Sequence, residues 1–233
     1  MTSSSQAPIE VVEGLLEARY SCRAFRPDPV PRPTIERILK AAQRTASWCN
    51  SQPWQVVIAS GAAARRFSDA IYQAASAATA ESGGSSDFPF PREYRGVYLD
   101  RRRESGFQLY SALGIVRGDK AGYRKQMLEN FRLFGAPHVA LITTDEALGV
   151  YGAVDCGGYV ANFMTAAQAL GVATVPQAAL AGYSDVVRRH FDLGADRRVV
   201  CGISFGFADG EHAANSYRTN RAAIPDTVTF FES

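Results

Sequence analysis

RYSCRAFRPDPVP, residues 19–31, gathers three arginines around one serine and then breaks any helix with three prolines. A planar guanidinium matches two oxygens of a phosphate group, and a neighbouring hydroxyl can donate a further hydrogen bond. The stretch therefore fits an anion-binding turn made by Arg19, Ser21 and Arg23. An arginine-rich surface turn after a helix is the alternative, because runs of charge are usually solvated.

A second polar stretch, ASWCNSQPWQVVIAS (residues 46–60), follows after one predicted helix. Asn50, Ser51 and Gln52 carry side chains that both donate and accept hydrogen bonds, immediately before a proline and a predicted strand. Such groups suit the polar edge of a flat heterocycle, whose carbonyl and N–H groups lie in one plane. Alone, the stretch is also compatible with an ordinary helix-to-strand turn. Its combination with the arginine turn favours a binding site.

The composition is that of a globular chain. It has 233 residues, of which 46% are hydrophobic and 21% charged, and its formal net charge is +2. This size allows one large core, or a protomer that shares its core with a partner. The balanced charge argues against a nucleic-acid partner, because such proteins need a strongly basic face.

Cysteine usage and the N-terminus indicate the compartment. Cys22, Cys49, Cys156 and Cys201 lie far apart and form no C-x-x-C pair, so neither a metal site nor a disulfide framework is predicted. The first ten residues lack the charged and apolar regions of a signal peptide. No apolar run reaches the roughly 18 residues that span a bilayer. We expect a soluble, cytoplasmic protein with reduced thiols and no membrane partner.

Periodicity in the apolar residues predicts the order of helices and strands. Helices are predicted over residues 8–19, 33–47, 62–79, 151–171 and 184–194, with others within 94–134, and strands over 54–60, 137–145, 172–179 and 197–208. Thr34 is expected to be a helix N-cap, and Gly171 a helix stop. Residues 81–91 are predicted to be a loop, and the tail ends in a β-prone run with no helix to pack on. The pattern predicts a single α+β domain over residues 1–233.

One apparent catalytic motif can be rejected. GISFG, residues 202–206, matches the G-x-S-x-G pattern of serine hydrolases, which requires a sharp strand-to-helix turn at the serine. Here apolar residues continue through Ser204, and little helical periodicity follows. His212 is the only histidine after the serine, and it lies too close in sequence to suggest a separate base-bearing loop. The three histidines also lack metal-ligand spacing, so no metal is expected.

Taken together, the two polar stretches resemble the N-terminal signature of the FMN-dependent nitroreductases. That signature reads R-x-S-x-R-x-[FY], then, after a helix, S-x-x-N-[ST]-Q-P-W. This chain supplies Arg19, Ser21, Arg23 and Phe25, then Ser47, Asn50, Ser51, Gln52, Pro53 and Trp54. The similarity continues in NFRLFGAPHVALI, VPQAALAGYSDVVRRHF and YRTNRAAIPDTVTF. VPQAA and RRRESGFQLYSALGI are most similar to the nitrobenzoate-reductase branch.

The resemblance implies a fold and a cofactor site. The fold is a homodimeric α+β structure with a mixed central sheet flanked by helices, exchanged C-terminal strands, and FMN in clefts formed by both subunits. An insertion over about residues 83–133 would cover the pocket. The residues that the resemblance assigns to FMN are Arg19, Tyr20, Ser21, Arg23, Ser47, Asn50, Gln52, Pro176, Gln177, Ala178, Ala179 and Arg221, with Arg218 as the alternative to Arg221 at the phosphate.

The resemblance also implies the chemistry. NADH or NADPH would reduce the flavin and leave, after which a nitroaromatic acceptor would use the same face, in a ping-pong sequence that needs no side-chain acid or base. The backbone N–H of Ala178 is expected to face flavin N5, and Arg23 is expected to stabilise the anionic reduced flavin. Nothing in the sequence chooses between NADH and NADPH.

Aromatic residues are the expected contacts of the acceptor. Trp48 would offer a flat apolar face beside the flavin, unless it is a buried core tryptophan like Trp54. The candidates for the opposite wall are Tyr98, Phe107 and Tyr110. The alternative functions are a quinone or flavin reductase or a reductive dehalogenase on the same scaffold, and a flavin-binding protein that does not turn over.

Overall fold

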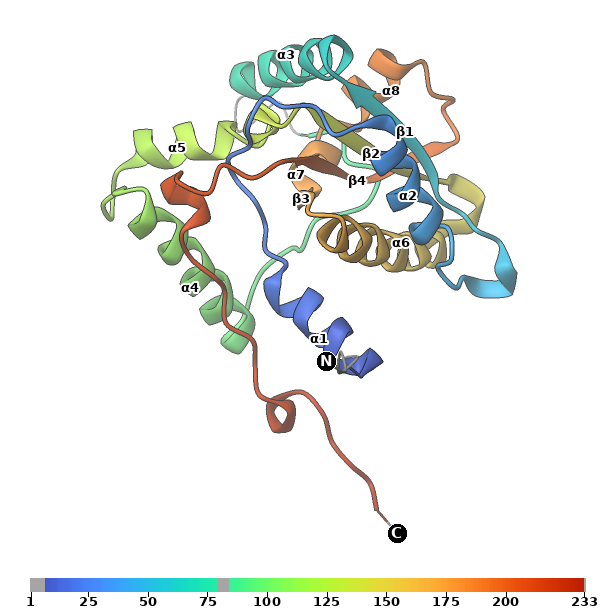
Figure 1. The fold of residues 1–233 in the computed structure, drawn as a ribbon. Helices are drawn as coiled ribbons and strands as arrows, with labels where there is room; N and C mark the ends of the chain where they lie inside the picture. The colour runs from blue at the N-terminus through green and yellow to red at the C-terminus, as the bar shows by residue number, and fades with distance from the viewer. Residues whose placement is uncertain (1–6, 79–83, 233) are drawn as a thin grey trace, which may run out of the picture.

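The computed structural model describes residues 7–78 and 84–232 (Figure 1). At its centre is a four-stranded sheet in the order β1-β2-β4-β3, in which each neighbouring pair is antiparallel. The strands are β1 (Gln55–Ser60), β2 (His138–Asp145), β3 (Ala173–Gln177) and β4 (Arg197–Gly206). Over the described residues, the parallel component of the expected mixed sheet is confined to one bridge, between Ser21 and Thr174.

Helices cover both faces of the sheet (Figure 1). In chain order they are α1 (Pro8–Ala18), α2 (Arg32–Ala42), α3 (Ala62–Ala77), α4 (Gly96–Ala112), α5 (Lys120–Leu128), α6 (Gly149–Ala169), α7 (Ala178–Ala181) and α8 (Ser184–Phe191). Alternate residues of β2 point to opposite faces, so Leu141 packs with Phe67 and Leu180 under α3 and α7, whereas Ile142 packs with Phe163 under α6. α4 and α5 extend to one side of this core.

Most predicted elements are present, with shifts at their ends. The expectation that Thr34 caps α2 is wrong, because the helix begins at Arg32 and its N-cap is Pro31. A second proline inside the first turn fixes φ there and lets the helix start early. Gly171 is confirmed as the stop of α6, with a φ of +70°. Residue 79 of the predicted helix, residues 81–83 of the predicted loop and residue 83 of the expected insertion lie outside the described residues.

The structure also confirms that the GISFG motif is not a hydrolase elbow. Ser204 lies inside β4, fully buried, and its hydroxyl donates a hydrogen bond to the side-chain oxygen of Gln177. A nucleophile must be exposed at a strand-to-helix turn, so this serine has a structural role.

Apolar surface remains exposed at two ends of the chain. α1 has no buried residue, and Ile9, Val12 and Leu16 of its predicted apolar stripe are all about half exposed or more. The C-terminal tail runs away from the body and ends with Phe230 and Phe231 exposed (Figure 1). The described part of the tail contains no strand. None of the described helices is long and apolar enough to cross a membrane.

A buried carboxylate anchors the segment that leads into α4. The side chain of Asp87 is 3% exposed and accepts hydrogen bonds from Arg188, at 2.5 and 2.7 Å, and from the Val199 N–H, at 2.7 Å. Burial alone raises the pKa of Asp87, but the bonds from Val199 and Arg188 outweigh burial and lower the pKa below its usual value. Asp87 therefore ties this segment to α8 and β4 as a carboxylate.

We predict that Asp87→Asn lowers the free energy of unfolding by about 2–4 kcal/mol, because it leaves Arg188 without a counter-charge. The matched control is Asp69→Asn, which breaks an exposed pair with Arg132 and should cost less than about 1 kcal/mol. Urea unfolding at pH 7 measures both. Since the pKa of Asp87 is lowered by folding, its contribution is present above about pH 4 and is lost as the pH falls through the folded-state pKa. Equal losses in the two variants would contradict the anchoring role.

Candidate functional site

The arginine turn lies beside β3. After α1 ends, Ser21 forms a parallel bridge with Thr174, and the Cys22 N–H donates to the Thr174 carbonyl at 3.0 Å. This pairing brings the turn next to the strand that ends in Pro176–Gln177. Two segments that the sequence assigned to one ligand are therefore neighbours in the folded chain.

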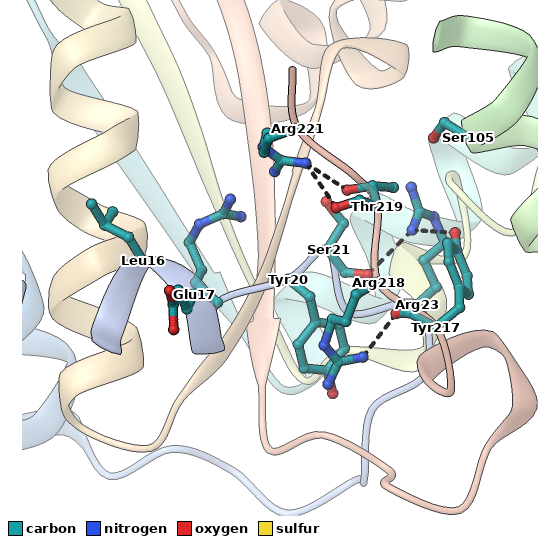
Figure 2. Close-up of a pocket in the computed structure, with 11 residues that line it drawn as sticks. Leu16, Glu17, Tyr20, Ser21, Arg23, Ser105, Tyr217, Arg218, Thr219 and Arg221 are labelled. Atoms are coloured by element: carbon teal, nitrogen blue, oxygen red, sulfur yellow. Dashed lines mark hydrogen bonds between the residues drawn. The ribbon is translucent and has the colours of Figure 1, made fainter. Parts of the chain in front are cut away.

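A cavity opens between the arginine turn, the end of α1, α4 and the segment 217–221 (Figure 2). Its volume is about 630 Å³, within the usual range of small-molecule sites. Of the predicted cofactor residues it is lined by Arg19, Tyr20, Ser21, Arg23 and Arg221, and by the alternative Arg218. It adds Leu16, Glu17, Ser105, Tyr217 and Thr219. The structure thus unites the predicted residues of both chain ends.

Of the four arginines of this cavity, Arg23, Arg218 and Arg221 are oriented by neutral groups. Arg23 Nη1 donates to the Ser21 carbonyl, at 3.2 Å, and to the Tyr217 hydroxyl, at 3.0 Å. Arg221 Nη1 donates to the Thr219 hydroxyl at 2.8 Å. Arg218 contacts Tyr20 by stacking rather than by a hydrogen bond: its guanidinium carbon lies 3.7 Å from the centre of the Tyr20 ring.

No ion pair neutralises these four side chains within residues 7–78 and 84–232. Burial, and then repulsion from Arg221, lowers the pKa of Arg19, so both effects disfavour its charged form. An anion between these guanidinium groups would relieve the repulsion and accept their remaining N–H groups. The cavity is therefore suited to a phosphate. Arg218 and Arg221 both line it, so the structure leaves both as candidates.

The end of β3 presents main chain rather than side chain. Gln177 is buried, and its amide is occupied by the Asn130 carbonyl, at 2.8 Å, and by the hydroxyl of Ser204. Ala178 and Ala179 follow as the first residues of α7, where the N–H groups have no partner inside the helix. Ala178 is exposed, and Pro176 and Ala179 are partly exposed, so a ligand can approach this end of the strand.

The second polar stretch forms a strained turn. Cys49, Asn50 and Gln52 have φ angles of +52°, +55° and +48°, in the left-handed region that ordinary residues rarely adopt. The Ser47 hydroxyl holds the turn by accepting from the Gln52 N–H at 2.9 Å. Such strain persists only where surrounding contacts fix it, and it is concentrated at functional sites.

This turn lies far from the arginine cavity of the same chain. The main-chain N–H of Trp48 donates to the Asp155 carboxylate at 3.1 Å. The Trp48 ring contacts Tyr151 edge-on, with 4.4 Å between the ring centroids. Both partners belong to the N-terminal part of α6, whereas Thr174 follows its C-terminal end. At 1.5 Å per residue, these ends are on the order of 20 Å apart. Ser47, Asn50 and Gln52 therefore do not join the arginines within one chain.

The aromatic residues expected to contact the acceptor also lie in two separate places, Trp48 against α6 and the others on α4. Trp48 is 58% exposed, so its alternative role as a core tryptophan is wrong, whereas Trp54 is buried. Tyr98 and Phe107 are exposed on α4, and Tyr110 packs against a tyrosine of α5. Phe107 lines a second cavity of about 720 Å³ next to the arginine cavity, and Trp48 does not contribute to it.

Sequence reasoning missed two residues that organise the site. Asn215 is buried and accepts from the Arg23 N–H at 2.8 Å, while its amide donates to the Ala24 and Asp209 carbonyls. Tyr217 holds the Arg23 side chain. Arg23 and Asn215 are 192 residues apart in sequence, and no local pattern marks such a contact.

Comparisons with known proteins agree with this geometry. The model of the nitroreductase family matches residues 16–207. The chain is 39% identical to nitroreductase NfnB of Mycolicibacterium smegmatis, over 95% of this chain and 93% of that protein. It is 28% identical to a 4-nitrobenzoate reductase of a Nocardioides species, over 95% and 90%. The crystal structure of the FMN-dependent NfnB from Mycobacterium smegmatis in complex with NADPH superposes with a TM-score of 0.91, at 36% identity, covering 97% of this chain and 100% of that one.

We predict that inorganic phosphate stabilises the ligand-free protein chiefly through Arg19 and Arg221. At about ten times its dissociation constant, phosphate adds roughly 1.4 kcal/mol, which raises the Tm by about 3–5 °C over chloride of equal ionic strength. The double variant Arg19→Gln/Arg221→Gln should lose this gain and should be no less stable in chloride, because two repelling charges are removed. Thermal unfolding measures both. An unchanged phosphate effect in the variant would exclude these arginines as the anion site.

Proposed function

Because the chain belongs to the nitroreductase family, we propose that it is an FMN-dependent NAD(P)H oxidoreductase that reduces nitroaromatic compounds. The observation that carries this proposal is the arginine cavity, whose lining turn is paired through Ser21 with β3, the strand that leads to Ala178. The chain matches most of the length of relatives named as a nitroreductase and a 4-nitrobenzoate reductase. These names support nitro reduction over quinone or flavin reduction and dehalogenation.

The residues of the cavity fit FMN. Arg19 and Arg221, with no carboxylate partner, would hold the phosphate. Ser21 and Arg23 would bind the polar part of the flavin, and the Ala178 N–H would face flavin N5. Arg19 and Arg23 are partly buried, and burial of a cation without an anion costs free energy, so an anionic ligand would stabilise this arrangement.

When bound, FMN supplies the redox chemistry, by taking a hydride from NAD(P)H and passing electrons to the nitro group. The protein's part is to orient and to stabilise charge. The Arg23 guanidinium would offset the negative charge that reduction adds, and the Ala178 N–H would donate a hydrogen bond from a fixed main chain. Neither group must gain or lose a proton, which suits a site without a side-chain acid or base.

We further propose a homodimer whose second copy completes the site. The turn of Ser47, Asn50 and Gln52 lies at the other end of α6 from the arginines, so only another chain can bring it to the same ligand. The apolar surfaces of α1 and of the C-terminal tail, exposed in one chain, would be covered by the partner. In that assembly Trp48 of one copy and the α4 aromatics Tyr98, Phe107 and Tyr110 would face the acceptor.

The remaining proposals concern organisation and compartment. The chain forms one domain, in which residues 84–133, with α4 and α5, cover the pocket as an insertion. The four cysteines are free, which fits the reducing conditions of the cytoplasm.

We predict that the purified protein is yellow and that NADPH or NADH bleaches it under nitrogen. A nitroarene should then restore the colour, because the acceptor removes the electrons. Absorbance near the flavin maximum measures both half-reactions in one cuvette. Colour without bleaching would identify a flavin-binding protein that does not turn over, and recovery with a quinone alone would identify a quinone reductase.

We predict that Val12→Asp weakens the dimer and releases FMN, because it places a carboxylate in the apolar face of α1. The control Gln73→Asp puts the same charge on the exposed side of α3 and should change neither property. Light scattering gives the mass, and absorbance gives the FMN content, over a range of protein concentrations. A wild-type monomer that carries one FMN per chain would refute the shared site.

A further inference from the structure

Arg23 differs from an ordinary surface arginine because its side chain is oriented but not neutralised. Its Nη1 donates to the Ser21 carbonyl and to the Tyr217 hydroxyl, and neither acceptor carries a charge (Figure 2). The guanidinium therefore has a fixed direction and keeps its full positive charge for a ligand. A carboxylate in place of either acceptor would give the same orientation but cancel the charge.

Two residues of the segment 215–217 produce this arrangement. Asn215 fixes the main chain of Arg23, and all its amide hydrogens and its oxygen are used in doing so. Tyr217 fixes the side chain, and its own carbonyl accepts from Arg218 at 2.8 Å. The segment thus controls both ends of Arg23.

The position of Tyr217 leaves its hydroxyl at the cavity. The residue is half-buried and lines both the arginine cavity and the neighbouring cavity with Phe107. Because the Tyr217 oxygen accepts from Arg23, its own hydrogen does not serve that bond. Loss of the hydroxyl would leave the Ser21 carbonyl as the remaining acceptor of Arg23 Nη1, and a long flexible side chain held at one point can swing.

We propose that Tyr217 is a positioning residue, whose phenol oxygen holds the Arg23 guanidinium where reduction adds negative charge to bound FMN. This role rests on the proposed function. It differs from phosphate binding, which falls to Arg19 and Arg221, so removal of the hydroxyl should change the redox equilibrium of FMN more than its affinity.

The test is the reduction potential of FMN in the holoprotein, measured against a reference dye under nitrogen. In Tyr217→Phe, the equilibrium constant for two-electron reduction should fall about tenfold, a potential lower by about 30 mV. The FMN dissociation constant should change less than about threefold. Tyr123→Phe is the matched control, because that hydroxyl bonds Gly118 and Val116 away from the cavity, and its potential should equal the wild-type value.

Two further variants separate positioning from direct contact. Tyr217→Gln restores an acceptor oxygen and should recover at least half of the shift. In an Arg23→Gln background, Tyr217→Phe should produce no additional shift, because the side chain that it positions is gone. Additive shifts, or an unchanged potential in Tyr217→Phe, would overturn the role. A wild-type protein that binds no FMN would overturn the proposed function itself, and with it this role.

Discussion

The main-chain bridge between Ser21 and Thr174 joins the arginine turn to the edge of the sheet. Strand β3 is held in turn by five paired positions along β4, so the turn inherits the rigidity of the central strands. This one contact places Arg19 and Arg23 beside the strand that leads to Ala178. A loop free of the sheet could carry the same residues without fixing them, and preorganised donors are what make such a site effective.

The charge of the cavity is the second consequence. Burial, and then repulsion from Arg221, lowers the pKa of Arg19, so both effects oppose folding with this side chain charged. The fold compensates with hydrogen bonds that Arg23 donates to the Ser21 carbonyl and the Tyr217 hydroxyl, and that Arg221 donates to the Thr219 hydroxyl. An ion-paired design would be more stable without ligand and would bind an anion less well. Stability and binding are therefore in conflict at this cavity, as is common where a site is held in a costly state.

The features that could be predicted from the sequence are those that residues close together in the chain determine. The turn from Arg19 to Phe25 and most helices and strands were predictable, because composition and periodicity act over a few residues. The exposure of α1 was not predictable, since its apolar stripe indicates a covering surface but not which chain provides it. Asn215 and Tyr217 could not be identified, because only the closed fold brings them to Arg23. Thr34 failed as a cap for a local reason, the prolines that start α2 earlier.

The length of α6 then determines how the two predicted motifs can act together. A helix of 21 residues is rigid at this scale, and it keeps the Ser47–Gln52 turn at one end and the arginines at the other. The left-handed residues of that exposed turn cost free energy, which the hydrogen bond from the Gln52 N–H to Ser47 and the contacts of Trp48 with α6 offset in part. In the proposed dimer the same turn would contact the ligand of the second copy, and these contacts would offset the cost of the strained backbone. Cofactor binding and association would then be linked, so each would strengthen the other by mass action.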